Sequence, residues 1–161
     1  MAEYNNITGQ SVSVIRPGQM YHYRYKPEGN IDYYDIFPLV FVVKKTMTLF
    51  EAINFHYLDL ERRLKLFELM KPYFTENVID ASTKLDYVDF KRVTLGLRTY
   101  RDARVSYRRY ILNNIKSKII RVVPTNWLNS IKKENHKFVT KKGGKFLAKR
   151  VWKHTLIESR K

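Results

Sequence analysis

Three arginines in the second half of the chain have the spacing of a helical stripe. Arg101, Arg104 and Arg108 are three and four residues apart, and the surrounding apolar pattern predicts a helix over about residues 102–115. On such a helix the three guanidinium groups would share one face, where their planar forks could pair with phosphates. A merely solvated face would interleave glutamates, and this one has only Asp102. The spacing therefore favours a surface that follows a phosphate backbone without reading bases.

Other basic side chains extend this candidate surface. Near the stripe they are Arg98, Arg109, Lys116, Lys118 and Arg121. In the C-terminal segment they are Lys141, Lys142, Lys145, Lys149 and Arg150. We predict that these residues, together with the stripe, bind nucleic acid or another polyanion.

The excess of positive charge lies entirely in the C-terminal part of this 161-residue chain, whose net charge is +16. Residues 1–90 hold 10 Lys and Arg against 12 Asp and Glu, a net of −2, while residues 91–161 hold 21 against 3, a net of +18. Charge this one-sided repels itself in the folded state, so it indicates an anionic partner. Nucleic acid and an acidic protein surface are the leading candidates, and anionic lipid is a weaker one.

Residues suited to catalysis are few. Asp32, Asp35 and His56 form the plausible acid–base cluster, and with Glu51 they are a weak version of the converging carboxylates of a metal-dependent nuclease. The chain has no cysteine, no histidine pair at metal-ligand spacing, no phosphate-binding glycine loop and no nucleophile elbow. The sequence therefore predicts a binding or structural protein, not an enzyme, with no metal and no cofactor.

The N-terminal third alternates with the period of β-strands. Strands are expected over residues 11–16, 19–26, 37–45 and 49–58, separated by turn sequences such as "PG" and "PEGN". They predict a small antiparallel sheet or partial barrel over about residues 11–58. Tyrosines in this region could stack on bases, but neighbouring acids would repel phosphate, so a core role is expected for Tyr21, Tyr23, Tyr25, Tyr33 and Tyr34.

After residue 58 the apolar period changes to about 3.6. Asp59 is expected to cap a helix that ends before Pro72 and buries Leu60, Leu64, Phe67 and Met70. A second helix is expected over about residues 83–97, a further strand over 117–123 and a short helix that carries Trp127. With the helix over 102–115, this gives an α+β fold of three to four helices behind the sheet, in a single domain over residues 1–135.

The last segment, residues 136–161, reads as a basic C-terminal tail. A glycine pair inside a lysine-rich run folds weakly by itself. We therefore expect a partner to order this tail, with Phe138, Phe146 and Trp152 as its anchoring residues.

Three stretches resemble a known family in their order and spacing. They are "PGQMYHYRYKPEGNIDYYDIFPLVFVV", "LFEAINFHYLDLERRLKLFELM" and "YRRYILNNIKSKIIRVVPTNWLNSI", which together cover roughly residues 17–131. They are similar to virion proteins of T-even-like contractile-tailed phages, often labelled DNA end protectors. The signature positions, which the resemblance implies are structural, are Tyr33, Asp35, Phe37, Pro38, Asn54, His56, Tyr57 and Leu58. The chain departs from the family pattern at Glu51, Ala52 and Asp59.

The resemblance and the charge together imply a phage virion structural protein. It would bind the end of packaged DNA or complete the head and neck, by electrostatic and steric occupancy. The alternative is a neck, tail or baseplate assembly protein whose basic half docks on acidic virion subunits without contacting DNA, and a nuclease is the second alternative. Expected partners are portal, neck or tail subunits and double-stranded DNA, with several copies in a symmetric assembly.

We expect the protein in the virion, and in the host cytoplasm during assembly. No run approaches the roughly 18 apolar residues of a membrane span, and the first residues lack the pattern of a signal peptide. A membrane is therefore not expected among its partners.

Overall fold

The computed structural model describes residues 1–76, 78–85 and 101–161. Within them, seven strands form one antiparallel sheet, in the order β1 (Ala2–Tyr4), β2 (Ile7–Val12), β8 (Ile119–Val122), β3 (Met20–His22), β5 (Leu39–Lys45), β6 (Leu49–Asn54) and β7 (Tyr107–Ile111). A smaller antiparallel sheet has the order β10 (Lys145–Phe146), β9 (Phe138–Thr140) and β4 (Tyr33–Asp35).

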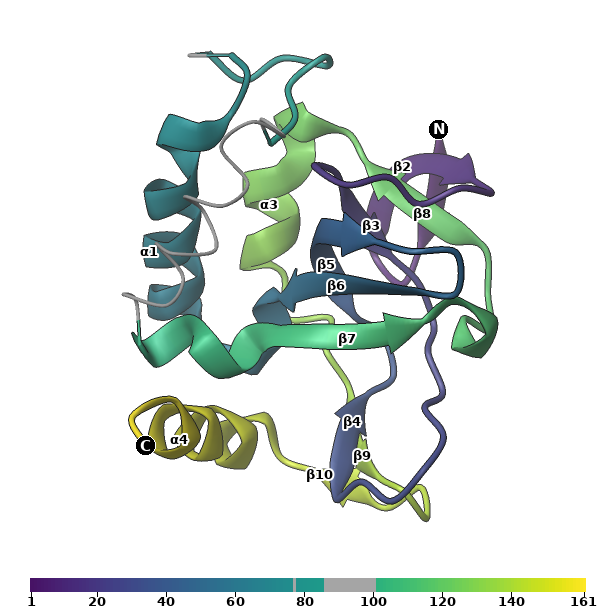
Figure 1. Cartoon of the computed structure of the whole chain (residues 1–161), viewed down its shortest axis with the longest axis vertical. Coiled ribbons are helices and arrows are strands. Elements are labelled where there is room, and N and C mark those ends of the chain that lie inside the picture. The colour runs from purple at the N-terminus through teal and green to yellow at the C-terminus, as the bar shows by residue number, and fades with distance from the viewer. Residues whose placement is uncertain (77, 86–100) are drawn as a thin grey trace.

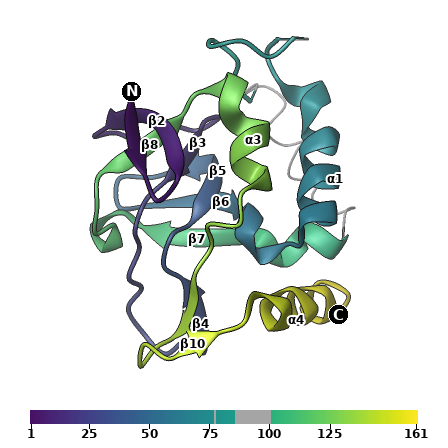
Figure 2. The same cartoon turned by 180° about the vertical axis from the view of Figure 1, so that it is seen from behind.

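Helices accompany both sheets. The α-helices of the described residues are α1 (Leu60–Met70), α3 (Trp127–Lys132) and α4 (Ala148–Ser159). Short 3-10 turns are η1 (Phe55–Tyr57), η2 (Lys71–Tyr73), η4 (Arg101–Ser106), η5 (Leu112–Asn114) and η6 (Pro124–Asn126). Helices α1 and α3 lie side by side against the large sheet, and α4 lies at the same end of the molecule as the small sheet (Figures 1 and 2). The predicted α+β class is confirmed.

The large sheet has a packed core on each face. Successive residues of a strand point to opposite faces, so Phe41 joins the cluster that contacts the helices, with Trp127 at its centre, while Val42 joins the other cluster. The second cluster contains Tyr21, Tyr23 and Tyr25, whose exposed fractions are 1%, 0% and 6%. The core role expected for these three tyrosines is confirmed.

Beyond β3 the chain folds over this second cluster. Tyr25 forms an isolated antiparallel bridge with Ile115, and the backbone N–H of Lys26 donates to the Asn114 carbonyl at 3.1 Å. The Ile111 backbone N–H donates a hydrogen bond to the Tyr25 hydroxyl at 2.9 Å. These contacts curl the sheet toward the partial barrel that the sequence offers as one alternative.

The first predicted helix is confirmed, but its buried face is shifted. The Asp59 side chain accepts a hydrogen bond from the Arg62 backbone N–H at 3.0 Å, which is an N-cap. Leu60 is 41% exposed. The residues that α1 buries are Arg63, Leu66, Phe67 and Met70. The guanidinium of Arg63 enters the core because it donates to the carbonyl oxygens of Phe55 and Leu58, at 3.0 and 2.7 Å.

The helix predicted over residues 102–115 is wrong. The short turn η4 is followed by β7, which pairs with β6 from Ile53↔Tyr107 to Leu49↔Ile111. The spacing of four between Tyr107 and Ile111 fits a helix, but it also fits alternate positions of a strand. Pairing with β6, more than fifty residues away in sequence, selects the strand over the helix.

The second predicted helix, over residues 83–97, lies mostly outside the described residues. Its expected start is described and is not helical. Thr83 accepts a hydrogen bond from the Asp80 backbone N–H at 2.9 Å, and Leu85 forms an isolated bridge with Phe74.

A buried carboxylate holds the small sheet against the large one. Asp35, at the end of β4, is 2% exposed. Its two oxygens accept hydrogen bonds from Asn54 Nδ2 (3.1 Å), His56 Nδ1 (2.7 Å) and the backbone N–H groups of Phe37 (3.1 Å) and Lys137 (3.4 Å). Burial alone would raise the pKa of Asp35, but the neighbouring His56 and these hydrogen bonds lower it below its usual value.

A second buried histidine extends this network. His22 Nδ1 donates to the Pro38 carbonyl at 2.9 Å, so in the neutral ring Nε2 accepts, and it receives the amide of Asn135 at 3.4 Å. The oxygen of that amide then faces His56 Nε2 at 3.1 Å. The two ring nitrogens of His56 thus face Asn135 on one side and Asp35 on the other, at 3.1 and 2.7 Å.

The neutral state of His22 makes the fold sensitive to acid. Burial, reinforced by the nearby His56, lowers the pKa of His22 to about 4 from 6.5. Between these values the unfolded chain binds a proton that the folded chain excludes, so stability falls as pH drops from about 6.5 to 4. Through His22, the free energy of unfolding is about 3 kcal/mol lower below pH 4 than above pH 6.5.

Urea unfolding at several pH values measures this effect. We expect the free energy of unfolding of the wild type to fall across this window, and to fall less in His22→Asn, whose amide can still donate to Pro38. Equal pH slopes in the two proteins would assign the acid sensitivity to other groups.

Candidate nucleic-acid interface

The three arginines of the predicted stripe do not lie on one helix. Arg101 and Arg104 are exposed residues of η4, whereas Arg108 is a partly buried residue of β7. Arg104 Nη2 donates to the carbonyl oxygen of Lys161 at 3.2 Å. The stripe is therefore replaced by a turn and a strand that bring Arg104 and Arg108 to one hollow, which Tyr33 and His154 also line.

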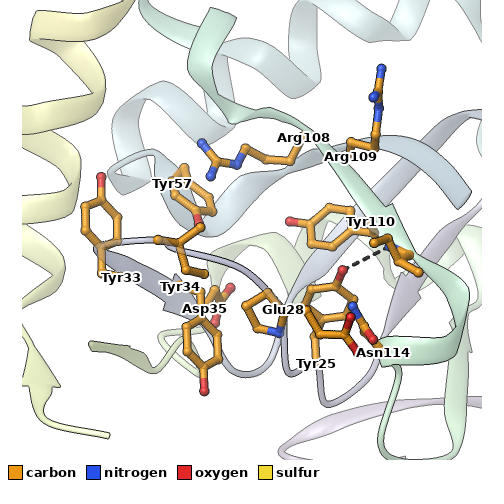
Figure 3. A pocket seen from close by; sticks show the side chains of 13 residues that line it. Tyr25, Glu28, Tyr33, Tyr34, Asp35, Tyr57, Arg108, Arg109, Tyr110 and Asn114 are labelled. Atoms are coloured by element: carbon orange, nitrogen blue, oxygen red, sulfur yellow. Dashed lines mark hydrogen bonds between the residues drawn. The ribbon is translucent and has the colours of Figure 1, made fainter. Parts of the chain in front are cut away.

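Neighbouring positions on β7 send Arg108 and Arg109 in opposite directions. The guanidinium of Arg108 lies over the ring of Tyr57, 4.6 Å from its centroid. Arg109 is 69% exposed, and its Nη2 is 4.0 Å from Glu51 Oε1 on β6. Figure 3 shows Arg108 reaching over Tyr57 while Arg109 points away from the rings. Alternation along the strand thus gives each arginine a different environment.

Arg108 stands at the edge of a pocket of about 220 Å³. The pocket lies between β7, the turn before β4 and η1 (Figure 3). It is lined by Tyr25, Pro27, Glu28, Ile31, Tyr33, Tyr34, Asp35, Tyr57, Arg108, Arg109, Tyr110, Ile111 and Asn114. Aromatic and apolar surface therefore adjoins a cation, which suits a ligand that is both flat and negatively charged.

The carboxylates of this pocket do not form a metal site. Asp35 accepts four hydrogen bonds from the protein, so its lone pairs are already used. His56, the expected partner of a nuclease site, donates to Asp35 and is fully buried, while Asp32 is exposed. Within the described residues no group of three or more His, Asp or Glu side chains could hold a metal ion.

A second basic group flanks the pocket at its Asn114 end. Lys116 and Lys118 are exposed, and the Lys116 backbone N–H donates to the Arg24 carbonyl at 2.8 Å. Through Lys26, whose backbone N–H donates to Asn114, this group is continuous with the pocket. Arg121 lies further along, where Nη1 donates to Gln10 Oε1 at 2.7 Å.

A third basic group comes from the hairpin of β9 and β10 and the start of α4. It consists of the exposed residues Lys141, Lys142, Lys145, Lys149 and Arg150. Lys141 Nζ donates to the carbonyl oxygen of Gly29, in the turn that borders the pocket. Gly143 has φ 87°, a value that favours glycine, so the glycine pair forms a hairpin turn. Arg98 lies outside the described residues.

Sequence reasoning missed two basic residues of this surface and the polar group beneath it. Arg24 and Lys26 are exposed and adjoin Lys116 and Asn114, although they lie in the nearly neutral N-terminal part. The sequence pattern that could have found them is their alternation with buried tyrosines, which indicates the outer face of an extended segment. Nothing in the sequence pointed to Asn114.

The residues expected to anchor the C-terminal segment on a partner contact the chain's own body. Phe138 packs on Tyr57 with ring centroids 5.3 Å apart, and Phe146 stacks on Tyr33 at 4.5 Å. Trp152 Nε1 donates to the His56 carbonyl at 3.0 Å. Residues 136–161 therefore contribute β9, β10 and α4 to the fold. Strand β9 pairs with β4, and the aromatic contacts form a small hydrophobic cluster between this segment and the body.

Comparison with known families now identifies the kind of protein. The model of a family described as "Phage T4 terminal DNA protecting protein" matches residues 3–155. The chain therefore belongs to this family of phage DNA-protecting proteins. The suspected relationship is confirmed.

Two other comparisons returned nothing. No curated protein and no solved structure matches the chain. Among the described residues, no helix is long and apolar enough to span a membrane.

The contact between α4 and η1 can be tested by one substitution. Trp152→Phe keeps most of the ring but removes the donor to the His56 carbonyl, so we expect a loss of about 1–2 kcal/mol in the free energy of unfolding. Lys153→Gln, at an exposed position of the same helix, is the control and should change stability by less than about 0.5 kcal/mol. Urea unfolding measures both. An unchanged Trp152→Phe variant would show that α4 does not support the body.

Proposed function

We propose that the protein binds the end of the packaged phage DNA and shields it by occupying it. The family assignment supports a role in protecting terminal DNA. The observation that carries the proposal further is the gathering of cations around two adjoining hollows that share Arg108. Arg104 lines one of these hollows, and hydrogen bonds join Lys26, Lys116 and Lys141 to segments beside them.

This arrangement suits a phosphate backbone in two respects. The cations are mostly exposed, so a duplex can approach them directly. Arg108 lies on a paired strand and Lys141 in a hairpin turn, which limits the entropy that these two lose on binding. Neutralised phosphates release counterions, so the affinity should depend steeply on salt.

Protection by occupancy requires no chemical step. A bound protein blocks an exonuclease sterically, and the affinity for the end sets how long the block lasts. The buried Asp35–His56 pair supports this proposal, because both groups serve the fold and neither is presented to a substrate.

The place of action that fits this role is the virion, at the junction of head and neck where the DNA end lies. Portal, neck or tail subunits would then be its protein partners, and a symmetric assembly would hold several copies. Assembly would occur in the host cytoplasm.

A salt series on DNA tests the proposal. Fluorescence anisotropy with a blunt duplex that has one open end should show log affinity falling with log salt, at a slope of roughly −0.9 per neutralised phosphate. A dumbbell of the same sequence, closed at both ends, should compete much less well. Bound protein should also slow digestion of the open end by an exonuclease.

Charge-matched variants locate the binding surface. The double variant Arg104→Gln/Lys141→Gln should reduce the salt slope by roughly 1 to 2, since up to two phosphate contacts are lost. The double variant Lys44→Gln/Lys71→Gln removes the same charge from β5 and from η2 and should leave the slope nearly unchanged.

Absence of DNA binding even at low salt would overturn the proposal. The basic surface would then bind acidic virion subunits, as in the alternative of a neck, tail or baseplate assembly protein. Equal affinity for the dumbbell and the open duplex would show DNA binding without recognition of ends.

A further inference from the structure

Two polar groups at the pocket beside Arg108 have no hydrogen-bond partner among the described residues. No carboxylate of the described residues lies within ion-pair distance of the Arg108 guanidinium, which contacts only the face of Tyr57 in the interactions found there. At the other end, Asn114 is 3% exposed, and its Nδ2 has no hydrogen-bond partner in the described structure. A buried amide donor without a partner costs about 1–3 kcal/mol, so its persistence here indicates that a ligand can satisfy it.

The contact with Tyr57 fixes the orientation of the arginine. Stacking on an aromatic face holds the guanidinium plane, while the N–H groups along its edge remain free to donate. Because Tyr57 is itself packed against Phe138, this platform is rigid. A guanidinium held in advance loses less entropy when it pairs with a phosphate.

The space between these two groups has the character of a site for a nucleobase. Its walls include Ile31, Pro27 and the rings of Tyr25 and Tyr110, and the cavity between them has a volume of about 220 Å³. The exposed carboxylate of Glu28 at its edge can accept from the amino or imino groups of a base. A duplex is too wide for such a pocket, whereas a single unpaired nucleotide is not.

We propose that this pocket takes one unpaired nucleotide from the DNA terminus. Arg108 binds its phosphate, the apolar walls hold its base, and the Asn114 amide donates to an acceptor on that base. The inference rests on the proposed function, because the surrounding cations bring the DNA end to the pocket. It goes beyond that function by making the unpaired nucleotide, instead of the blunt end of the helix, the feature that distinguishes an end from the rest of the duplex.

The test uses the full chain and DNA hairpins with one open end. The open end is blunt, or carries a single unpaired nucleotide on the 5′ strand or on the 3′ strand, and a closed dumbbell completes the set. We expect one overhang to bind at least about tenfold tighter than the blunt end, the difference that a bidentate phosphate contact and a stacked base can supply. The preferred overhang identifies the strand that the pocket holds.

Two variants and a control connect this preference to the pocket. Arg108→Lys keeps the charge but loses the planar fork, and Asn114→Asp replaces the free donor with an acceptor of similar shape. Each should abolish the overhang preference, measured as the ratio of overhang to blunt-end affinity within the same variant. Arg109→Lys, at a lining position on the same strand whose 69% exposed side chain points away from the rings, should keep the preference (Figure 3).

The outcomes separate this inference from the proposed function. If open ends outcompete the dumbbell but overhang and blunt ends bind equally, the end-binding function stands and the pocket inference is overturned. If the dumbbell competes equally with every open end, both fail. If Asn114→Asp unfolds, Arg108→Lys decides alone, and a preference that survives in Arg108→Lys also overturns the inference.

Discussion

The buried pair of Asp35 and His56 is the interaction on which the arrangement of this protein depends. Asp35 belongs to β4 of the small sheet, while Asn54 ends β6 of the large one and His56 lies in η1, directly after it. A carboxylate with exposed fraction 2% is costly unless its charge is matched and its lone pairs are filled, and here both conditions are met. The pair therefore fixes how the two sheets meet, and with it the position of the turn that borders the pocket.

Much of the fold could be predicted from local pattern. The alternation over β3, the β-branched and aromatic composition of β5 and β6 and the cap of α1 are local features of the sequence. The types of these elements were therefore correct, and only their limits shifted. The short strand β7 could not be predicted in this way. The spacing of Tyr107 and Ile111 satisfies both periods, and only the distant partner β6 decides between them.

The candidate site shows the same division. Composition located the positive charge in the C-terminal part, and the structure places Arg104, Arg108 and Lys141 near one pocket. The geometry could not be foreseen, because it results from pairing between β4 and β9, which are about a hundred residues apart. Phe138 and Trp152 were recognised as anchors from their type, but their contacts with Tyr57 and His56 are properties of the folded chain.

The position of β8 has a consequence for how the chain is made. This strand lies between β2 and β3, although more than ninety residues separate it from them in sequence. While a ribosome is still synthesising the preceding residues, β2 and β3 have no partner between them and leave open edges. The large sheet can therefore close only after residue 122 has emerged, and such distant pairing is intrinsically slow. The protein consequently acquires its cationic surface as a nearly complete chain, and not while its N-terminal strands are emerging.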